Sequence, residues 1–159
     1  MTAKIVEQNI VVVTGTRYPP PYAAPCLQRQ RARLGDAAGL TQFGVNRLHL
    51  PPGCWSSQRH WHSAEDEFVY VLEGAVVLIT DAGEELLRAG DAAGFKAGAA
   101  NGHQLQNRSA SAVVVLEVGS RRPGEDAVDY PDIDLQIAKG QGVYAHRDGR
   151  LYDTAPPRR

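Results

Sequence analysis

Two histidines and a glutamate that lie close together in the sequence have the residue types and spacing of a metal site. His60 and His62 are separated by one residue, and Glu67 follows after four more. If this segment forms a β-strand, both imidazoles point to the same face and Trp61 points to the other. Glu67 opens the apolar run Phe68–Leu72, which predicts a second strand beside the first. Two imidazoles and a carboxylate directed at one point indicate a site for a divalent metal.

A second block of glycine, histidine and asparagine lies downstream, at Gly90, Gly98, His103 and Asn107. With the first block in place, the chain resembles the cupin family. That family has a first motif G(X)5HXH(X)3-4E(X)6G and a second motif G(X)5PXG(X)2H(X)3N. The chain matches the first motif from His60 to Gly74 and the second at the four residues named above.

The chain departs from the two motifs at three places. Six residues instead of five separate Gly53 from His60, and Lys96 stands where the second motif has proline. The segment that precedes His103 is two residues longer than in the motif, whereas His103 and Asn107 keep the family spacing. The resemblance implies that His103 is the fourth metal ligand.

The C-terminal part resembles that of a group of small bacterial single-domain cupins. These have a tail like Tyr130–Leu135, followed by a turn like His146–Gly149. The resemblance implies an all-β fold, the double-stranded β-helix (jelly-roll) barrel of cupins, with an N-terminal arm and a short C-terminal β/turn extension. Because most members of this group have no assigned activity, it implies a fold and a site rather than a reaction.

The hydrophobic pattern independently favours an all-β chain of about eight short strands, with turns at regular spacing. The expected strands are Thr41–Leu50, Trp55–His62, Glu67–Leu72, Ala75–Thr80, Glu85–Arg88, Ala92–Phe95, His103–Asn107 and Ala112–Val118. We therefore expect residues 41–118 to form the barrel. Residues 1–40 are expected to be an arm on the barrel or on a partner subunit, with 26–39 as a solvated loop or short helical turn. Residues 119–159 are expected to form the C-terminal extension.

The four ligands His60, His62, Glu67 and His103 do not select one metal. Three imidazoles and one carboxylate suit Zn, Ni, Fe, Mn or Co, so we expect one divalent transition metal per chain. The alternative is a polar cluster without metal. Other residues have simpler explanations. Glu65 fits neither the motif nor the face, Asn107 is expected to make hydrogen bonds, and Cys54 is expected to be packed. We expect His49 to lie on a strand surface or line the pocket, and His146 to lie in a turn.

The composition excludes several kinds of partner. The chain has 159 residues with a formal net charge of −1, so it has no basic field for nucleic acid. Its two cysteines do not make a disulfide scaffold, and the apolar run Ile10–Val13 is too short for a signal peptide or membrane span. We therefore expect a cytoplasmic protein. The proline-rich segment Tyr18–Tyr22 has no core of its own, which suggests a homodimer in which the arm or an edge strand crosses between subunits.

The sequence leaves two classes of function open. One is a metalloenzyme of the dioxygenase, isomerase/epimerase or lyase type that acts on a small, partly hydrophobic substrate chelating the metal through oxygen. The other is a non-catalytic binding or sensor module for a small molecule. A general acid or base facing the metal would favour the enzyme, and the candidates by face or proximity are Arg47, His49 and Tyr70.

Overall fold

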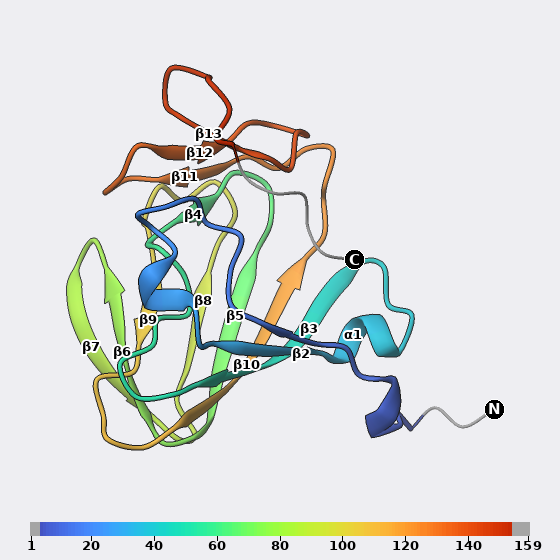
Figure 1. The fold of residues 1–159 in the computed structure, drawn as a ribbon. Coiled ribbons are helices and arrows are strands. Elements are labelled where there is room, and N and C mark those ends of the chain that lie inside the picture. The colour runs from blue at the N-terminus through green and yellow to red at the C-terminus, as the bar shows by residue number, and fades with distance from the viewer. Residues whose placement is uncertain (1–3, 154–159) are drawn as a thin grey trace.

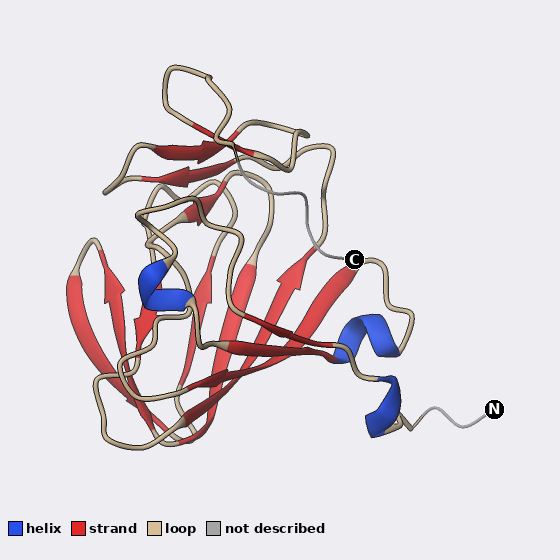
Figure 2. Ribbon diagram, in the orientation of Figure 1, coloured by secondary structure: helices blue, strands red, loops and turns tan. Residues whose placement is uncertain are grey.

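The computed structural model describes residues 4–153, and almost all of its regular structure is β-strand (Figures 1 and 2). The largest sheet has six strands in the order β1 (Val12–Thr14), β2 (Gln30–Arg33), β3 (Phe43–Leu50), β10 (Val113–Ser120), β5 (Glu67–Glu73) and β8 (Ala92–Phe95). A three-stranded sheet has the order β7 (Gly83–Arg88), β6 (Ala75–Thr80) and β9 (Gln104–Gln106). A four-stranded sheet has the order β13 (Tyr144–Ala145), β12 (Leu135–Ile137), β11 (Val128–Tyr130) and β4 (Trp61–His62). The helices are single turns: η1 (Glu7–Asn9), η2 (Ala24–Cys26) and α1 (Leu34–Ala37). The prediction of an all-β chain is confirmed.

The apolar core lies between the six-stranded and three-stranded sheets. Alternate residues of β3, β5 and β10 point inward and pack against side chains of β6, β7 and β9, such as Val76, Leu87 and Leu105. The turn between β5 and β6 needs Gly74, whose φ is +82° and whose added Cβ would come within 3.0 Å of the Ala112 carbonyl oxygen. The last glycine of the first motif therefore allows the tight turn that connects β5 to β6.

Strand register arranges the inward face of the large sheet in layers, because residues that pair across antiparallel strands lie side by side on one face. The three layers, each running from β5 through β10 to β3, are Val71–Val115–Leu48, Val69–Glu117–Asn46 and Glu67–Gly119–Gly44. The first layer is fully buried and apolar. Polarity increases toward the end of the barrel at which Glu67 lies.

The N-terminal segment is part of the largest sheet. Strand β2 pairs with β3, so that Arg31 lies opposite the buried Leu48, and β1 adds the edge strand. The expectation of a solvated loop or helical turn over residues 26–39 is therefore wrong for β2, but Leu27 and Gln28 lie in an exposed turn and Leu34–Ala37 form the helical turn α1. Arginine-rich composition concealed the strand, since Ala32 is the one apolar residue of β2.

The four-stranded sheet lies across one end of the barrel (Figure 1). Strand β4 joins it to the barrel, and a second apolar cluster that includes Tyr18, Tyr130 and Leu135 fills the space beneath. Arg59 forms an ion pair with Asp132, between β11 and β12 of this sheet, in which Nη2 lies 2.6 Å from Oδ1. The C-terminal extension thus covers the end of the barrel near Glu67. In residues 4–153, no helix is both long and apolar enough to cross a membrane.

Candidate metal centre

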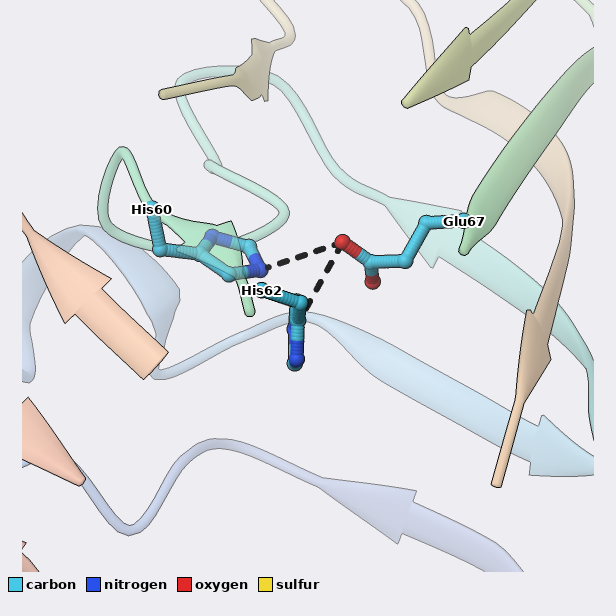
Figure 3. Close-up of side chains that lie close together, drawn as sticks. All are labelled: His60, His62 and Glu67. Atoms are coloured by element: carbon cyan, nitrogen blue, oxygen red, sulfur yellow. Dashed lines mark ion pairs between the residues drawn. The ribbon is translucent and has the colours of Figure 1, made fainter. Parts of the chain in front are cut away.

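The structure brings His60, His62 and Glu67 together at the covered end of the barrel. His62 ends β4, His60 immediately precedes that strand, and Glu67 begins β5. Their ligand atoms all lie within 4.8 Å of one another. Glu67 Oε2 is 3.6 Å from His60 Nε2 and 3.5 Å from His62 Nε2, and Figure 3 shows both rings directed at this carboxylate.

The other ring nitrogen of each histidine has an acceptor of its own. His60 Nδ1 lies 2.9 Å from the Gln58 carbonyl oxygen, and His62 Nδ1 lies 2.6 Å from Asp126 Oδ2. Because these oxygens accept hydrogen bonds, they favour the tautomer with the proton on Nδ1. In that tautomer each Nε2 presents a lone pair toward Glu67.

The arrangement fits a bound cation. Glu67 Oε2 is buried and has no hydrogen-bond partner within the described chain. Two imidazole lone pairs directed at an anionic oxygen repel it unless positive charge lies between them, and a buried unpaired carboxylate is costly. A divalent metal would satisfy the carboxylate and both imidazoles together, which protonation of a single imidazole would not.

His103 reaches the same carboxylate from another part of the chain. Its Nε2 lies 2.9 Å from Glu67 Oε2, and its ring stacks on Phe95 with the centroids 3.6 Å apart. His60 and His103 exchange backbone hydrogen bonds, which holds the two residues side by side. The Gly98 amide, which precedes the longer segment before His103, donates to the His62 carbonyl oxygen at 2.9 Å.

Electrostatics keep the carboxylate of this cluster ionised. Burial, the largest single effect, raises the pKa of Glu67, but contacts with His103 and His60 outweigh it and hold the pKa well below its ordinary value. Burial lowers the pKa of His103 despite the nearby carboxylate. For His60, burial also lowers the pKa, but the contacts with Glu67 raise it overall. An ionised carboxylate beside a neutral His103 is the protonation state that a metal requires.

The cluster opens into a cavity of about 320 Å³ inside the barrel. Its walls carry apolar side chains such as Val69, Phe95 and Leu105, but also three arginines and three glutamates: Arg29, Arg31, Arg121, Glu65, Glu67 and Glu117. A second cavity of about 220 Å³ lies beside His62 and includes Lys96. Apolar side chains therefore form only part of the lining, and the cavity suits a more strongly polar molecule than the partly hydrophobic substrate expected from the sequence.

The three acid–base candidates taken from the sequence do not line either cavity. Arg47 and Tyr70 share one row through Leu116 on the outer face of the large sheet, and His49 lies on the same face as Arg47. The alternation of β3 explains the error, because Leu48 and Leu50 are the residues that point inward. His49 therefore lies on the strand surface, which is one of the two positions expected for it.

The remaining polar candidates have structural roles. Asn107 donates to the carbonyl oxygens of Leu50 and Ser111, both at 2.8 Å, which confirms that it makes turn hydrogen bonds. Cys54 is buried in the apolar core, as expected. His146 binds Asp134 at 2.6 Å and stacks on Tyr152, away from the described cavities.

Sequence reasoning missed two kinds of functional residue. Asp126, which orients His62, lies 64 positions away in the C-terminal extension, and no spacing rule connects the two. Arg31 and Glu117 belong to β2 and β10 and face the cavity. A charged residue in the apolar run of β10 was the available signal, since a glutamate among valines on an inward position requires a partner.

Comparison with known proteins identifies relatives of this fold. The family model described as "Cupin domain" matches residues 46–119. A solved structure from Silicibacter pomeroyi, named as a sugar phosphate isomerase from a cupin superfamily, is 42% identical, with 94% of this chain and 96% of that chain covered and a TM-score of 0.86. A putative sugar phosphate isomerase from Acidithiobacillus ferrooxidans is 32% identical over 74% of each chain, with a TM-score of 0.69.

A more distant structure supports the fold alone. The predicted oxalate decarboxylase from Thermotoga maritima is 22% identical, with 77% of this chain and 100% of that chain covered and a TM-score of 0.58. No curated protein sequence matches this chain. The predicted jelly-roll architecture is confirmed by these structural neighbours.

Proposed function

Because the chain belongs to the cupin family, we propose that it is a metal-dependent isomerase of a small sugar phosphate. In this proposal one divalent metal is held by His60, His62, Glu67 and His103. The active site is the cavity of about 320 Å³ that His60, Glu67 and His103 line.

One observation carries the proposal. His60 and His62, each with Nδ1 beside an oxygen acceptor, direct Nε2 at a buried Glu67 oxygen that has no hydrogen-bond partner in the described chain. His103 approaches the same oxygen to 2.9 Å. Such a set supplies nitrogen and oxygen donors for a transition metal, while the adjoining cavity leaves room for a substrate.

The names of the two similar structures select among the reaction types that the sequence leaves open. Both are named as sugar phosphate isomerases, one of them putative, and they are 42% and 32% identical to this chain. The structure named as an oxalate decarboxylase is only 22% identical, so it supports the fold and not the lyase reaction. Isomerisation is therefore favoured over dioxygenase and lyase chemistry.

Isomerisation of a sugar moves a proton between two neighbouring carbons that carry a carbonyl and a hydroxyl group. A divalent metal, when bound, polarises the carbonyl and lowers the cost of the negative charge that develops on its oxygen. The chain supplies the ligand set, carboxylates that can take up a proton, and the Phe95 ring that fixes His103. The charged lining of the cavity favours a hydroxylated substrate over the partly hydrophobic one expected from the sequence.

The test combines elemental analysis with an activity screen. Protein purified without added metal should carry one divalent metal per chain, and it should interconvert an aldose and a ketose phosphate in a panel from trioses to hexoses, followed by NMR. Removal of the metal by a chelator should abolish conversion. Protein that contains no metal, or metal-loaded protein that binds sugar phosphates but converts none of them, would refute the isomerase and favour the binding or sensor module.

A further inference from the structure

An arginine and a glutamate form an ion pair inside the barrel, in the same cavity as the ligand cluster. Arg31 Nε lies 2.6 Å from Glu117 Oε2, and Arg31 Nη2 lies 2.9 Å from Oε1. The two side chains are 28% and 20% exposed, and both line the cavity with His60, Glu67 and His103. This pair is therefore accessible to a molecule that binds at the cluster.

Strand register fixes the position of the pair relative to the ligands. Glu117 pairs with Val69 and Gly119 pairs with Glu67, so Glu117 and Glu67 are diagonal neighbours on the inward face. Such neighbours have Cα atoms about 7–8 Å apart. A molecule that reaches from the metal position to the pair therefore needs only a few carbon atoms.

Two glycines continue the layer of Glu67 across β10 and β3, Gly119 and Gly44. Neither has a positive φ, so the backbone does not require glycine at these positions. The Arg121 guanidinium covers Gly44, at 3.4 Å from an added Cβ. An added Cβ at Gly119 would lie 3.8 Å from Glu67 Cγ, so the missing side chain at Gly119 leaves space between Glu67 and Glu117.

Stability alone does not explain a charged pair at these inward positions. Replacing a buried ion pair by apolar residues of similar volume is often neutral or stabilising, because two charges must be desolvated. The layer beneath is entirely apolar, with Val71, Val115 and Leu48. An apolar pair at these positions would extend that core, so the charged pair is better explained by what it binds.

The hydrogen-bonding capacity of the pair matches hydroxyl groups. Arg31 has five N–H donors and uses Nε and Nη2 for Glu117, while Nη1 has no hydrogen-bond partner among the described residues. The Glu117 carboxylate retains acceptor sites beyond those two bonds, and Asn46 lies beside it in register. This wall therefore presents hydrogen-bond donors beside acceptors. A row of hydroxyl groups can satisfy both, because each hydroxyl group both donates and accepts.

We infer that Arg31 and Glu117 bind the hydroxyl groups of the substrate's carbon chain while its chelating end occupies the metal. This subsite rests on the proposed function, since it presupposes a ligand at the metal. It makes the site selective for polyhydroxylated molecules over short chelators.

An anionic group does not fit the same position. The pair carries no net charge, and a phosphate beside Arg31 would also meet the Glu117 carboxylate. Arg29, which also lines the cavity, donates to the Gly15 and Ser56 carbonyl oxygens and so is committed to the backbone. The polar wall therefore selects neutral hydroxyl groups.

Two acids with the same chelating end test the inference. Glycolate and D-arabinonate both chelate through a carboxylate and an α-hydroxyl, but only D-arabinonate has a polyhydroxyl tail. Calorimetry on the protein with its purified metal should give a Kd for D-arabinonate at least tenfold lower than for glycolate. In Arg31→Met/Glu117→Met, metal content and the glycolate Kd should stay within twofold, while the preference should fall below threefold.

A milder variant and a matched control keep the test decisive. Glu117→Gln retains the side-chain shape and should reduce the preference at least threefold even if the double variant does not fold. Arg47→Met, on the outer face of the same sheet, should change neither Kd. Equal binding of the two acids by the wild-type protein, or a full preference in folded Arg31→Met/Glu117→Met, would overturn this subsite. A wild-type protein that contains no metal would instead overturn the proposed function.

Discussion

The Asp126 carboxylate lies 2.6 Å from His62 Nδ1, on the opposite edge of the ring from the nitrogen that faces Glu67. Asp126 also accepts a hydrogen bond from the Ala64 amide at 2.8 Å, so the carboxylate is itself fixed. The C-terminal extension therefore reaches into the candidate metal centre, because Asp126, just before β11, orients the ring of His62 on β4 and favours its Nδ1 tautomer.

Replacing Asp126 should weaken metal binding without removing a ligand. The neutral amide in Asp126→Asn stabilises the Nδ1 proton of His62 less than the carboxylate does. We therefore expect the metal affinity to fall by about 10- to 100-fold. Competition with a chromogenic chelator measures the change. The control is Asp129→Asn, because Asp129 accepts from Trp61 Nε1 and not from a ligand. Equal affinity in Asp126→Asn and wild type would exclude this orienting role.

Removing a ligand should have a larger effect. His60→Ala and His103→Ala should each reduce metal occupancy to below about a tenth of a metal per chain while the fold persists, because each loss breaks the shell of donors. Elemental analysis after dialysis gives the occupancy, and circular dichroism reports the fold. His146→Ala serves as the control, since His146 lies in a turn of the extension. Stoichiometric metal in His60→Ala would rule out the ligand assignment.

The sequence predicts the local parts of this molecule well. His60, His62 and Glu67 lie within eight consecutive positions, and their spacing on two neighbouring strands predicts that they converge. The three residues do lie together, although only Trp61 and His62 of the expected strand Trp55–His62 form a strand. Strands with a strong apolar pattern, such as Ala75–Thr80, have the predicted bounds. In these segments short-range periodicity determines both the element and the direction of its side chains.

The parts that depend on distant pairing could not be predicted. β2 has the sequence Gln-Arg-Ala-Arg, and it is a strand because it pairs with β3 and not because of its own composition. Arg31 faces inward since its register partner Leu48 does. The contact between Asp126 and His62 likewise depends on where the extension packs. Pairing between distant segments is not visible in a single sequence, so Arg31 and Asp126 could not be placed at the site.

The two cysteines should be unreactive in the folded protein. Cys26 is fully buried, and burial raises its pKa to about 11. At pH 8 only about 0.1% of such a thiol is ionised, and the thiolate is the reactive form. Native protein treated with iodoacetamide should remain unlabelled at Cys26 by mass spectrometry, whereas protein in concentrated urea should be labelled. Rapid labelling of native protein at Cys26 would show that the N-terminal segment opens.

We expect the protein to be a two-fold dimer. Strand β5 exposes Phe68, Tyr70 and Leu72 on the outer face of the large sheet, at 42%, 38% and 42%, and β1 forms an edge on the opposite side of the same sheet. Light scattering should give about twice the chain mass of 17.2 kDa. Phe68→Glu/Leu72→Glu should yield monomers, whereas Leu86→Glu on the other sheet should not. A wild-type monomer at micromolar concentration would contradict the dimer.

Glu67→Gln separates a ligand from a catalytic base. Contacts with the surrounding histidines hold the pKa of Glu67 well below its ordinary value, although burial, the largest single effect, raises it. A carboxylate with so low a pKa is a poor proton acceptor but a good anionic ligand. We therefore expect Glu67→Gln to lose about 100-fold or more in metal affinity and to lose turnover in parallel.

Glu65→Gln is the matched control, because Glu65 lines the same cavity but is not one of the proposed ligands. It should keep full metal occupancy. If Glu67→Gln instead retains stoichiometric metal and still loses turnover, Glu67 acts as the base that moves the proton. If Glu65→Gln is the variant that loses metal, the ion is held by the neighbouring group of His62, Glu65 and Asp126.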